Sequence, residues 1–224
     1  MPARRPHLLL LNASLAGDAG NTAVLLARAR RLLARRATVE TLILSSLPAS
    51  GSQLSAFRSQ PTPFPVPQLS TLNPQLRTAL ARANGLLIGT GTHWDSWSSV
   101  LQKFLEDATA TEATKLWLGK PAAVFVSEHS TGGKGVLSRL QGVLVTFGCS
   151  IPPMSGLVLS RAAVIAARHD ADAAHDFWCE DDLLVACHNL AEAARTSLPG
   201  AKPALPRWRN WPVDREGFAA RWLN

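Results

Sequence analysis

Short apolar runs alternate along most of the chain with longer stretches that repeat at the helical period. The apolar runs have the length and composition of buried strands, which we expect at residues 7–13, 38–45, 85–90, 121–127 and 151–160. The stretches of helical period predict helices at roughly 20–36, 72–83, 96–108, 134–147 and 176–196. This alternation is typical of parallel βαβ units. We therefore predict an α/β fold with one open sheet.

Amphipathic spacing is clearest in the later helices. Apolar residues recur at i, i+3, i+4, i+7 and i+8 in the third helix, at Trp97, Val100, Leu101, Phe104 and Leu105. The last helix repeats in a similar way. Each such helix presents one apolar stripe, which fits helices packed on the faces of a sheet.

Two segments interrupt the alternation. Residues 47–74 are rich in Pro, Ser, Gln and Thr and form an unusually long connection, which could cover a site or make a subunit contact. The segment after Ser197 carries three tryptophans among prolines and arginines. It can pack on its own domain or on a partner subunit. We divide the chain into a domain at 1–197 and a Trp/Pro-rich tail at 198–224.

Composition and charge narrow the class of protein. The chain is 46% hydrophobic and 17% charged, enough apolar residues for a substantial core. The net charge is +7, and most of the excess comes from arginines in the first 36 residues, five of them in the first expected helix. No aromatic residues are interleaved with these arginines, so we interpret them as a solvated helix face and predict no nucleic-acid binding.

The N-terminal apolar run bears on the location of the protein, and the cysteine spacing bears on metal binding. The run Leu8 to Leu11 is too short for a signal peptide and suits a buried first strand. No apolar stretch is long enough to span a membrane. The three cysteines, Cys149, Cys179 and Cys187, have no metal-site spacing, and we expect buried thiols and no metal. We predict a cytoplasmic protein.

The segment "NASLAGDAGNT" links the first strand to the first helix. A strand, a turn with glycine and a helix start together form an anion site, because unpaired backbone N–H groups and the positive helix end converge there. Ser14, Asn21 and Thr22 could hold a phosphate without a lysine or arginine. The P-loop and Rossmann glycine patterns are both absent, which disfavours nucleotide hydrolysis and a dinucleotide site.

Two further loops follow the third and fourth strands, "GTGTHWDSW" at 89–97 and "SEHSTGGKG" at 127–135. Ligands bind outside the carboxyl ends of the strands in open α/β sheets. Three loops of small and polar residues at one edge therefore predict a site for a flat molecule with a phosphate tail. Asp95 is expected to cap the third helix, and Lys134 either to approach the ligand or to lie in solvent.

These three loops and the segment "VTFGCSIPP" resemble the flavodoxin-like NAD(P)H-dependent FMN reductases, particularly the WrbA-type quinone reductases, over about residues 7–165. The resemblance implies a flavodoxin-like doubly wound sheet of five parallel strands, order 2-1-3-4-5, with helices on both faces. It implies bound FMN, with NADPH or NADH as co-substrate. The FMN-binding residues by this resemblance are Ser14, Gly20, Asn21, Thr22, Thr90, Gly91, Thr92, His93, Trp94, Ser127, Glu128, His129, Thr131, Gly132 and Gly133.

The chain departs from that family's pattern at three places. Gly91 replaces a proline, Glu128 and His129 replace a Thr-Gly pair, and Thr146-Phe147 stands where many WrbA-type members have histidines near the flavin. Because no serine-elbow motif is present, a hydrolase is disfavoured. In a flavoenzyme the cofactor carries out the chemistry, so no dedicated acid or base is required.

We therefore expect an FMN-dependent NAD(P)H oxidoreductase that reduces a quinone, a flavin or a similar acceptor. The family likeness also implies a homodimer or homotetramer whose contacts complete the flavin site. Two alternatives stay open at this point. One is a flavodoxin-type electron carrier without an NAD(P)H site, and the other is an interaction protein of this fold that has lost FMN.

Overall fold

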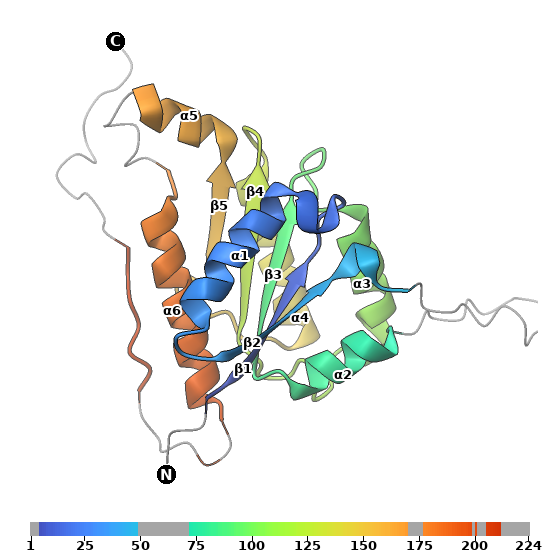
Figure 1. The fold of residues 1–224 in the computed structure, drawn as a ribbon. Coiled ribbons are helices and arrows are strands. Elements are labelled where there is room, and N and C mark those ends of the chain that lie inside the picture. The colour runs from blue at the N-terminus through green and yellow to red at the C-terminus, as the bar shows by residue number, and fades with distance from the viewer. Residues whose placement is uncertain (1–4, 49–71, 170–176, 199, 201–204, 212–224) are drawn as a thin grey trace, which may run out of the picture.

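A single parallel sheet organises the chain in the computed structural model, which describes residues 5–48, 72–169, 177–198, 200 and 205–211. The five strands are β1 (His7–Asn12), β2 (Thr38–Ile43), β3 (Gly85–Gly91), β4 (Ala122–Glu128) and β5 (Gly156–Ser160). Their order is β2-β1-β3-β4-β5, and all pairs are parallel (Figure 1). The fold is therefore the predicted flavodoxin-like doubly wound sheet.

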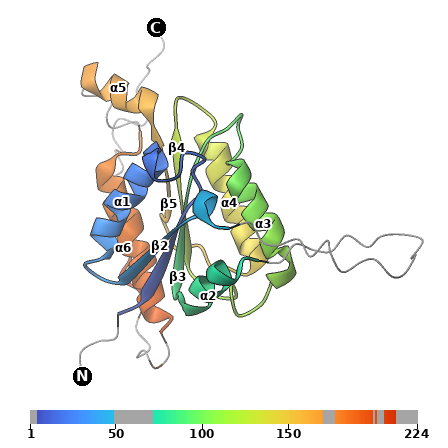
Figure 2. The same cartoon turned by 45° about the vertical axis from the view of Figure 1, so that its right-hand side comes forward.

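Helices cover both faces of this sheet. They are α1 (Asn21–Leu33), α2 (Pro74–Arg82), α3 (Ser99–Ala108), α4 (Gly133–Phe147), α5 (Arg161–His169) and α6 (Glu180–Thr196). Figure 2 shows α1 and α6 on one face and α2, α3 and α4 on the other. Each layer has its own apolar core against the sheet. The helical period predicted helices packed on a sheet, and the family resemblance implied that they cover both faces.

β1 shows why the sheet is buried on both faces. Leu8 and Leu10 belong to the core under α1 and α6, whereas Leu9 and Leu11 belong to the core under α2, α3 and α4. All four side chains are 0% exposed. Side chains alternate between the two faces of a strand, so a strand between two helical layers needs a continuous apolar run. β1 is thus a central strand of the sheet.

Two elements differ from the expectation. The predicted strand at 151–160 begins only at Gly156, because Pro152 and Pro153 cannot donate backbone hydrogen bonds to a sheet ladder and Met154 has a φ of 52°. The helix α5 was not predicted, although its alanine-rich sequence favours helix. It continues directly from β5 and projects beyond the carboxyl edge of the sheet (Figure 1).

An aromatic cluster lies at the amino-terminal edge of the sheet, within the core under α2, α3 and α4. Trp117 is fully buried, its ring centroid lies 4.9 Å from that of Phe147, and its indole N–H donates to the Thr111 hydroxyl at 2.9 Å. Phe147 ends α4, so it lies at the edge opposite the three loops. The position that the resemblance aligns with histidines near the flavin therefore lies, in this chain, at the far end of α4 from the three loops.

The same edge contains a buried lysine. Lys120 donates to the Leu80 carbonyl at the end of α2, and burial lowers the pKa of its ammonium group to about 8. Burial also raises the pKa of the nearby Cys149 thiol to about 11. Cys149 and Cys187 are buried as expected, whereas Cys179 is exposed, which corrects that part of the prediction.

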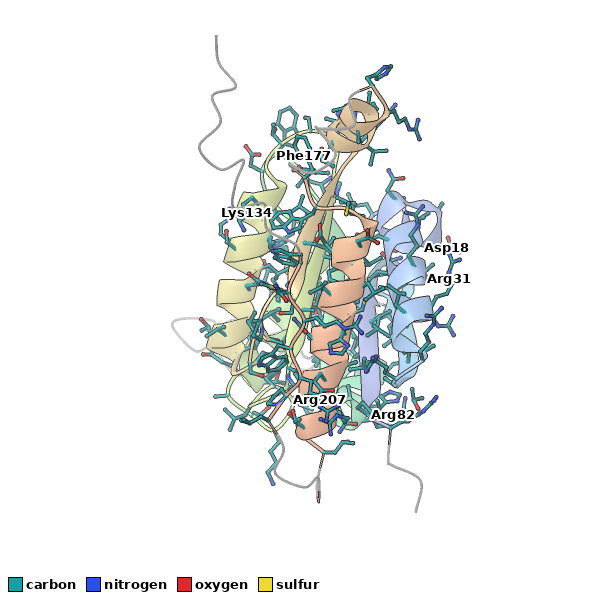
Figure 3. The ribbon with its side chains drawn as sticks, turned by 90° about the vertical axis from the view of Figure 1, so that its left-hand side faces the viewer. Asp18, Arg31, Arg82, Lys134, Phe177 and Arg207 are labelled. Atoms are coloured by element: carbon teal, nitrogen blue, oxygen red, sulfur yellow. The ribbon has the colours of Figure 1, made fainter. Side chains whose placement is uncertain are left out.

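Part of the C-terminal segment, residues 205–211, packs on α6. The Glu192 carboxylate accepts from the Arg207 amide at 3.1 Å, and the Asn189 side chain exchanges two hydrogen bonds with the Arg209 backbone, both at 2.8 Å. Figure 3 shows Arg207 beside the lower part of α6. These described residues pack on their own domain, while the rest of the tail, including Trp222, and most of 47–74 lie outside the described residues.

The Glu192 contact makes stability depend on acid pH. Hydrogen bonds from Arg195 lower the pKa of Glu192 from 4.5 to about 2, and the carboxylate is 6% exposed. Its stabilising contribution is complete above pH 4.5 and is lost as pH falls toward 2. We expect Glu192→Gln to cost about 1–2 kcal/mol at pH 7 and to flatten the decline of melting temperature below pH 4.5, measured by calorimetry. Glu112 is exposed, so Glu112→Gln should change neither the stability at pH 7 nor the decline of melting temperature in acid. An unaltered decline in Glu192→Gln would contradict the role given to the Glu192 carboxylate.

Candidate functional site at the carboxyl edge of the sheet

The three loops predicted to bind a ligand meet at the carboxyl edge of the sheet. The Thr22 and Ser127 hydroxyls are 2.9 Å apart, which joins the first loop to the third. The Ser98 hydroxyl donates to the Ala13 carbonyl at 2.5 Å and joins the second loop to the first. The Thr92 amide donates to the Ser127 carbonyl at 3.0 Å. Segments more than 80 residues apart in sequence thus form one continuous rim.

The first loop holds itself in shape by internal hydrogen bonds. The Asn12 side chain accepts from the Ser14 amide at 3.0 Å and donates to the Gly17 carbonyl at 2.8 Å. The Ser14 hydroxyl accepts from the Ala16 amide at 3.2 Å. A Cβ at Gly20 would lie 2.5 Å from the Ser14 hydroxyl oxygen, so only glycine fits there without movement. The loop is pre-shaped before any ligand arrives.

The start of α1 is left open by this loop. Its cap residue, Gly20, provides no side-chain hydrogen bond, so the first amides of the helix remain available to an anion. Asn21 is exposed at this position, whereas Thr22 is 2% exposed and its hydroxyl faces Ser127. Asn21 and the amides can therefore contact a phosphate that enters from solvent. The buried Thr22 hydroxyl instead links the first loop to the third.

The second loop forms a tight hairpin that displays a tryptophan. His93 and Ser96 exchange two backbone hydrogen bonds, at 2.8 and 3.0 Å. Trp94 and Asp95 between them have φ values of 48° and 58°, as the central residues of a type I′ turn do. Such angles are unusual for a bulky residue and cost energy. The Trp94 side chain is 102% exposed, so it does not pack under α3, and the turn holds its indole in solvent at the edge of the site.

Asp95 does not cap α3, contrary to the expectation. The cap is Ser98, whose hydroxyl accepts from the Leu101 amide at 3.2 Å, because the turn at 93–96 delays the start of the helix. The Asp95 side chain lies instead against Gly132, and its carbonyl accepts from Arg139 of α4. Ser98 and Arg139 were not predicted from the sequence, although a serine directly before an apolar helical period is a cap signal.

The third loop places a carboxylate at the start of α4. Glu128, the last residue of β4, accepts from the Gly133 amide at 2.5 Å. Gly132 has a φ of 91°, which favours glycine, and a Cβ on Gly133 would collide with Val158 and Glu128. His129 and Thr131 are exposed on the loop.

The remaining predicted residues belong to the second and third loops. Thr90 is fully buried and its hydroxyl accepts weakly from the Ser98 amide, at 3.4 Å. Gly91 and Thr92 are half-buried, and a Cβ on Gly91 would meet only ordinary contacts. Lys134 is exposed, and its ammonium nitrogen lies 4.8 Å from the centroid of the Trp178 ring (Figure 3). The structure thus gathers the predicted residues at one edge but gives them different neighbours.

Arginines form a second surface away from this edge. A groove between α1 and α6 is lined by Arg28, Arg31 and Arg35 from the first helix and its end, and by Asp181 and Leu184 from the last. These arginine side chains are exposed, as expected for the outer face of α1. In the described part of the chain, no three His, Cys, Asp or Glu residues gather as a metal ion would require. None of its helices is long and apolar enough to cross a bilayer.

The comparison with known families is decisive for the class of protein. Residues 6–164, which include all three loops, match the NADPH-dependent FMN reductase family. The chain belongs to this family. The match does not separate the WrbA-type branch from the others. A search of curated proteins finds no match.

Solved structures support the fold over almost the whole chain. RosB, solved with the bound intermediate 8-demethyl-8-formylriboflavin-5′-phosphate, aligns with a TM-score of 0.66 and 15% identity over 98% of both chains. The NADH:FMN oxidoreductase EmoB aligns with a TM-score of 0.57 and 17% identity over 91% of this chain and 95% of EmoB. A WrbA-like flavodoxin from Agrobacterium tumefaciens aligns with a TM-score of 0.56 and 14% identity. The alignment covers 86% of this chain and 99% of the flavodoxin. At these identities the likeness shows the shared fold.

The residues present fit the FMN that the family implies. The uncapped start of α1 can take the phosphate, and Gly20 keeps its approach open. In flavodoxin-like folds with this strand order, 2-1-3-4-5, the ligand site lies at the switch point between β1 and β3. β4 is two strands from β1, about 10 Å at the usual strand spacing, so one FMN could reach from the first loop to the third.

Proposed function

We propose that this protein binds FMN at the carboxyl edge of its sheet and uses it to transfer electrons from NADPH or NADH to a quinone, a flavin or a similar flat acceptor. The observation that carries the proposal is the meeting of the open α1 start with the loops after β3 and β4. When bound, FMN would supply the redox chemistry, and the chain would supply binding, orientation and electrostatics.

The first loop is proposed to hold the phosphate through backbone amides and Asn21, with Ser14 keeping the loop in shape. An anion at a helix start gains about 0.3–1 kcal/mol from the dipole, and more from hydrogen bonds to the amides. RosB, similar over 98% of the chain, holds a riboflavin 5′-phosphate derivative, which supports a ligand of this size and charge.

The second loop is proposed to contact the acceptor. A rigid turn that holds Trp94 entirely in solvent is costly unless the indole finds a partner. An aromatic ring stacks on a tryptophan face with a gain of about 0.5–1.5 kcal/mol beyond the buried area. Trp94 beside the site therefore favours a flat aromatic acceptor, such as a quinone or a flavin, over a small aliphatic one.

The electron-carrier alternative is less consistent with the chain. Electron-carrier flavodoxins are usually acidic and often shield the flavin with tyrosine, whereas this chain has a net charge of +7 and no tyrosine. The alternative of an FMN-less interaction protein was motivated by Gly91, Glu128 and Phe147. Phe147 no longer supports it, because this residue lies at the opposite edge of the sheet.

One spectroscopic experiment separates the three functions. We expect the purified protein to bind added FMN, seen as a shift and resolution of the flavin absorbance, and NADPH or NADH to bleach that absorbance without oxygen. Subsequent addition of a benzoquinone should restore it. Bound flavin that neither nicotinamide bleaches would indicate the electron carrier, and a protein that binds no FMN would indicate the interaction protein.

The assembly and location are part of the same proposal. We propose a cytoplasmic homodimer or homotetramer in which a second subunit helps to cover the flavin. Support comes from exposed apolar side chains beyond the carboxyl edge, Val164 and Ile165 on α5 and Phe177 before α6, with exposed fractions of 50%, 44% and 48%. Exposed apolar side chains close to a site are typical of an interaction surface.

A further inference from the structure

Two carboxylates converge on the start of α4. The Glu128 carboxylate accepts from the Gly133 amide at 2.5 Å. The Asp95 side chain lies so close to Gly132 that a Cβ there would collide with it. The two acids come from different loops, Glu128 from the end of β4 and Asp95 from the turn after β3. Two negative charges therefore lie at a helix end whose dipole is positive.

The cations of this region are directed elsewhere. Lys134 lies over the Trp178 ring, and the Arg139 guanidinium donates to the Asp95 carbonyl and lies 5.6 Å from the centroid of the Trp97 ring. Arg139 reaches the backbone carbonyl of Asp95, and no ion pair to the Glu128 carboxylate is found among the described residues. Because Glu128 also accepts from the Gly133 amide, it is the acid placed most directly at this helix start.

This arrangement has an electrostatic consequence for the proposed function, on which it rests. A free helix start would stabilise negative charge on a ligand beside it, but the Glu128 carboxylate already occupies that position. Flavin reduced by two electrons and one proton carries one more negative charge than oxidised flavin. We propose that Glu128, supported by Asp95, makes the third loop disfavour reduced FMN relative to oxidised FMN and so gives the protein a strongly reducing flavin.

The family resemblance implies that the pyrimidine edge of the flavin lies at this loop, and the Glu128 carboxylate is suited to that edge. A carboxylate accepts hydrogen bonds and cannot donate them, so Glu128 suits a ligand N–H and opposes a carbonyl oxygen. The flavin ring has one such N–H, in its pyrimidine ring, between two carbonyl groups. Glu128 is therefore a positioning residue for the pyrimidine end, and it recognises the N–H rather than the oxygens.

The test compares the affinities of oxidised and reduced FMN. Glu128→Gln keeps an oxygen that can accept from the Gly133 amide and removes the charge, and Asp95→Asn does the same at the second acid. We expect Glu128→Gln to tighten reduced FMN relative to oxidised FMN about tenfold, which raises the two-electron reduction potential of bound FMN by about 30 mV. Asp95→Asn should shift the potential in the same direction by less, because Glu128 is the acid that accepts from an amide at the start of α4.

The control and the outcomes separate this inference from the proposed function. Glu112→Gln removes the same charge from an exposed position at the opposite edge of the sheet and should leave the potential unchanged. Wild-type protein that binds FMN, combined with an unchanged potential in Glu128→Gln, would overturn the inference and leave the proposed function intact. Absence of FMN binding in the wild-type protein would overturn both. Circular dichroism of each variant checks that the fold is retained.

Discussion

Replacing Asn21 by glutamate is expected to weaken FMN binding at least about 100-fold, a loss of about 2.7 kcal/mol, while the protein stays folded. Asn21 is exposed at the first position of α1, and the helix start beside it has no side-chain cap. A carboxylate there would compete with the phosphate for the same amides and repel it. Negative charge at a helix start is favourable in itself, so the melting temperature should not fall.

Two comparisons make this result specific. Val24→Glu places the same charge one turn further along α1, at a side chain that is 51% exposed, and should reduce affinity much less. Thr22 is a poorer test position, because it is 2% exposed and a carboxylate there would also unfold the loop. FMN affinity within threefold of wild type in Asn21→Glu, measured by fluorescence titration, would mean that the phosphate binds elsewhere.

Replacing Trp117 by alanine is expected to destabilise the protein by about 3–5 kcal/mol. The indole is 0% exposed, packs between Phe104 and Phe147, and donates to the Thr111 hydroxyl. Its removal leaves a large cavity and loses the hydrogen bond to the Thr111 hydroxyl, which still donates to the Ala108 carbonyl at 2.6 Å. The measurement is the change in the urea concentration at the midpoint of unfolding. The dependence of the unfolding free energy on urea concentration should be the same in the variant and in wild type.

The matched control is the next residue. Leu118→Ala removes an apolar side chain that is 67% exposed and should change stability by about 0.5 kcal/mol or less. Because Trp117 lies at the amino edge of the sheet, Trp117→Ala should retain FMN affinity at temperatures where it is still folded. A loss of stability below about 1 kcal/mol would show that this aromatic core is not a rigid part of the fold.

The sequence determined the architecture, because the relevant signals are local. Four leucines in β1 indicate a strand buried on both faces, and the helical period of residues such as Leu101 and Phe104 indicates a helix on a sheet. Alternation of such elements leads to a parallel sheet, and in a parallel sheet the loops after successive strands share one edge. The position of the site therefore followed from chain order, and the small polar residues of the loops gave its chemical class.

Only the tertiary structure decided how individual side chains are used, because their partners are distant in sequence. Glu128 and Asp95 meet at the start of α4 although 33 positions separate them, and the Thr22 hydroxyl reaches Ser127 over 105 positions. Phe147 lies at the opposite edge because α4 runs the full depth of the sheet. Periodicity records which face of an element is apolar, but it carries no information on which polar groups from separate loops come within hydrogen-bonding distance. Those distances depend on strand register, turn geometry and the length of each helix, and they exist only once the chain has folded.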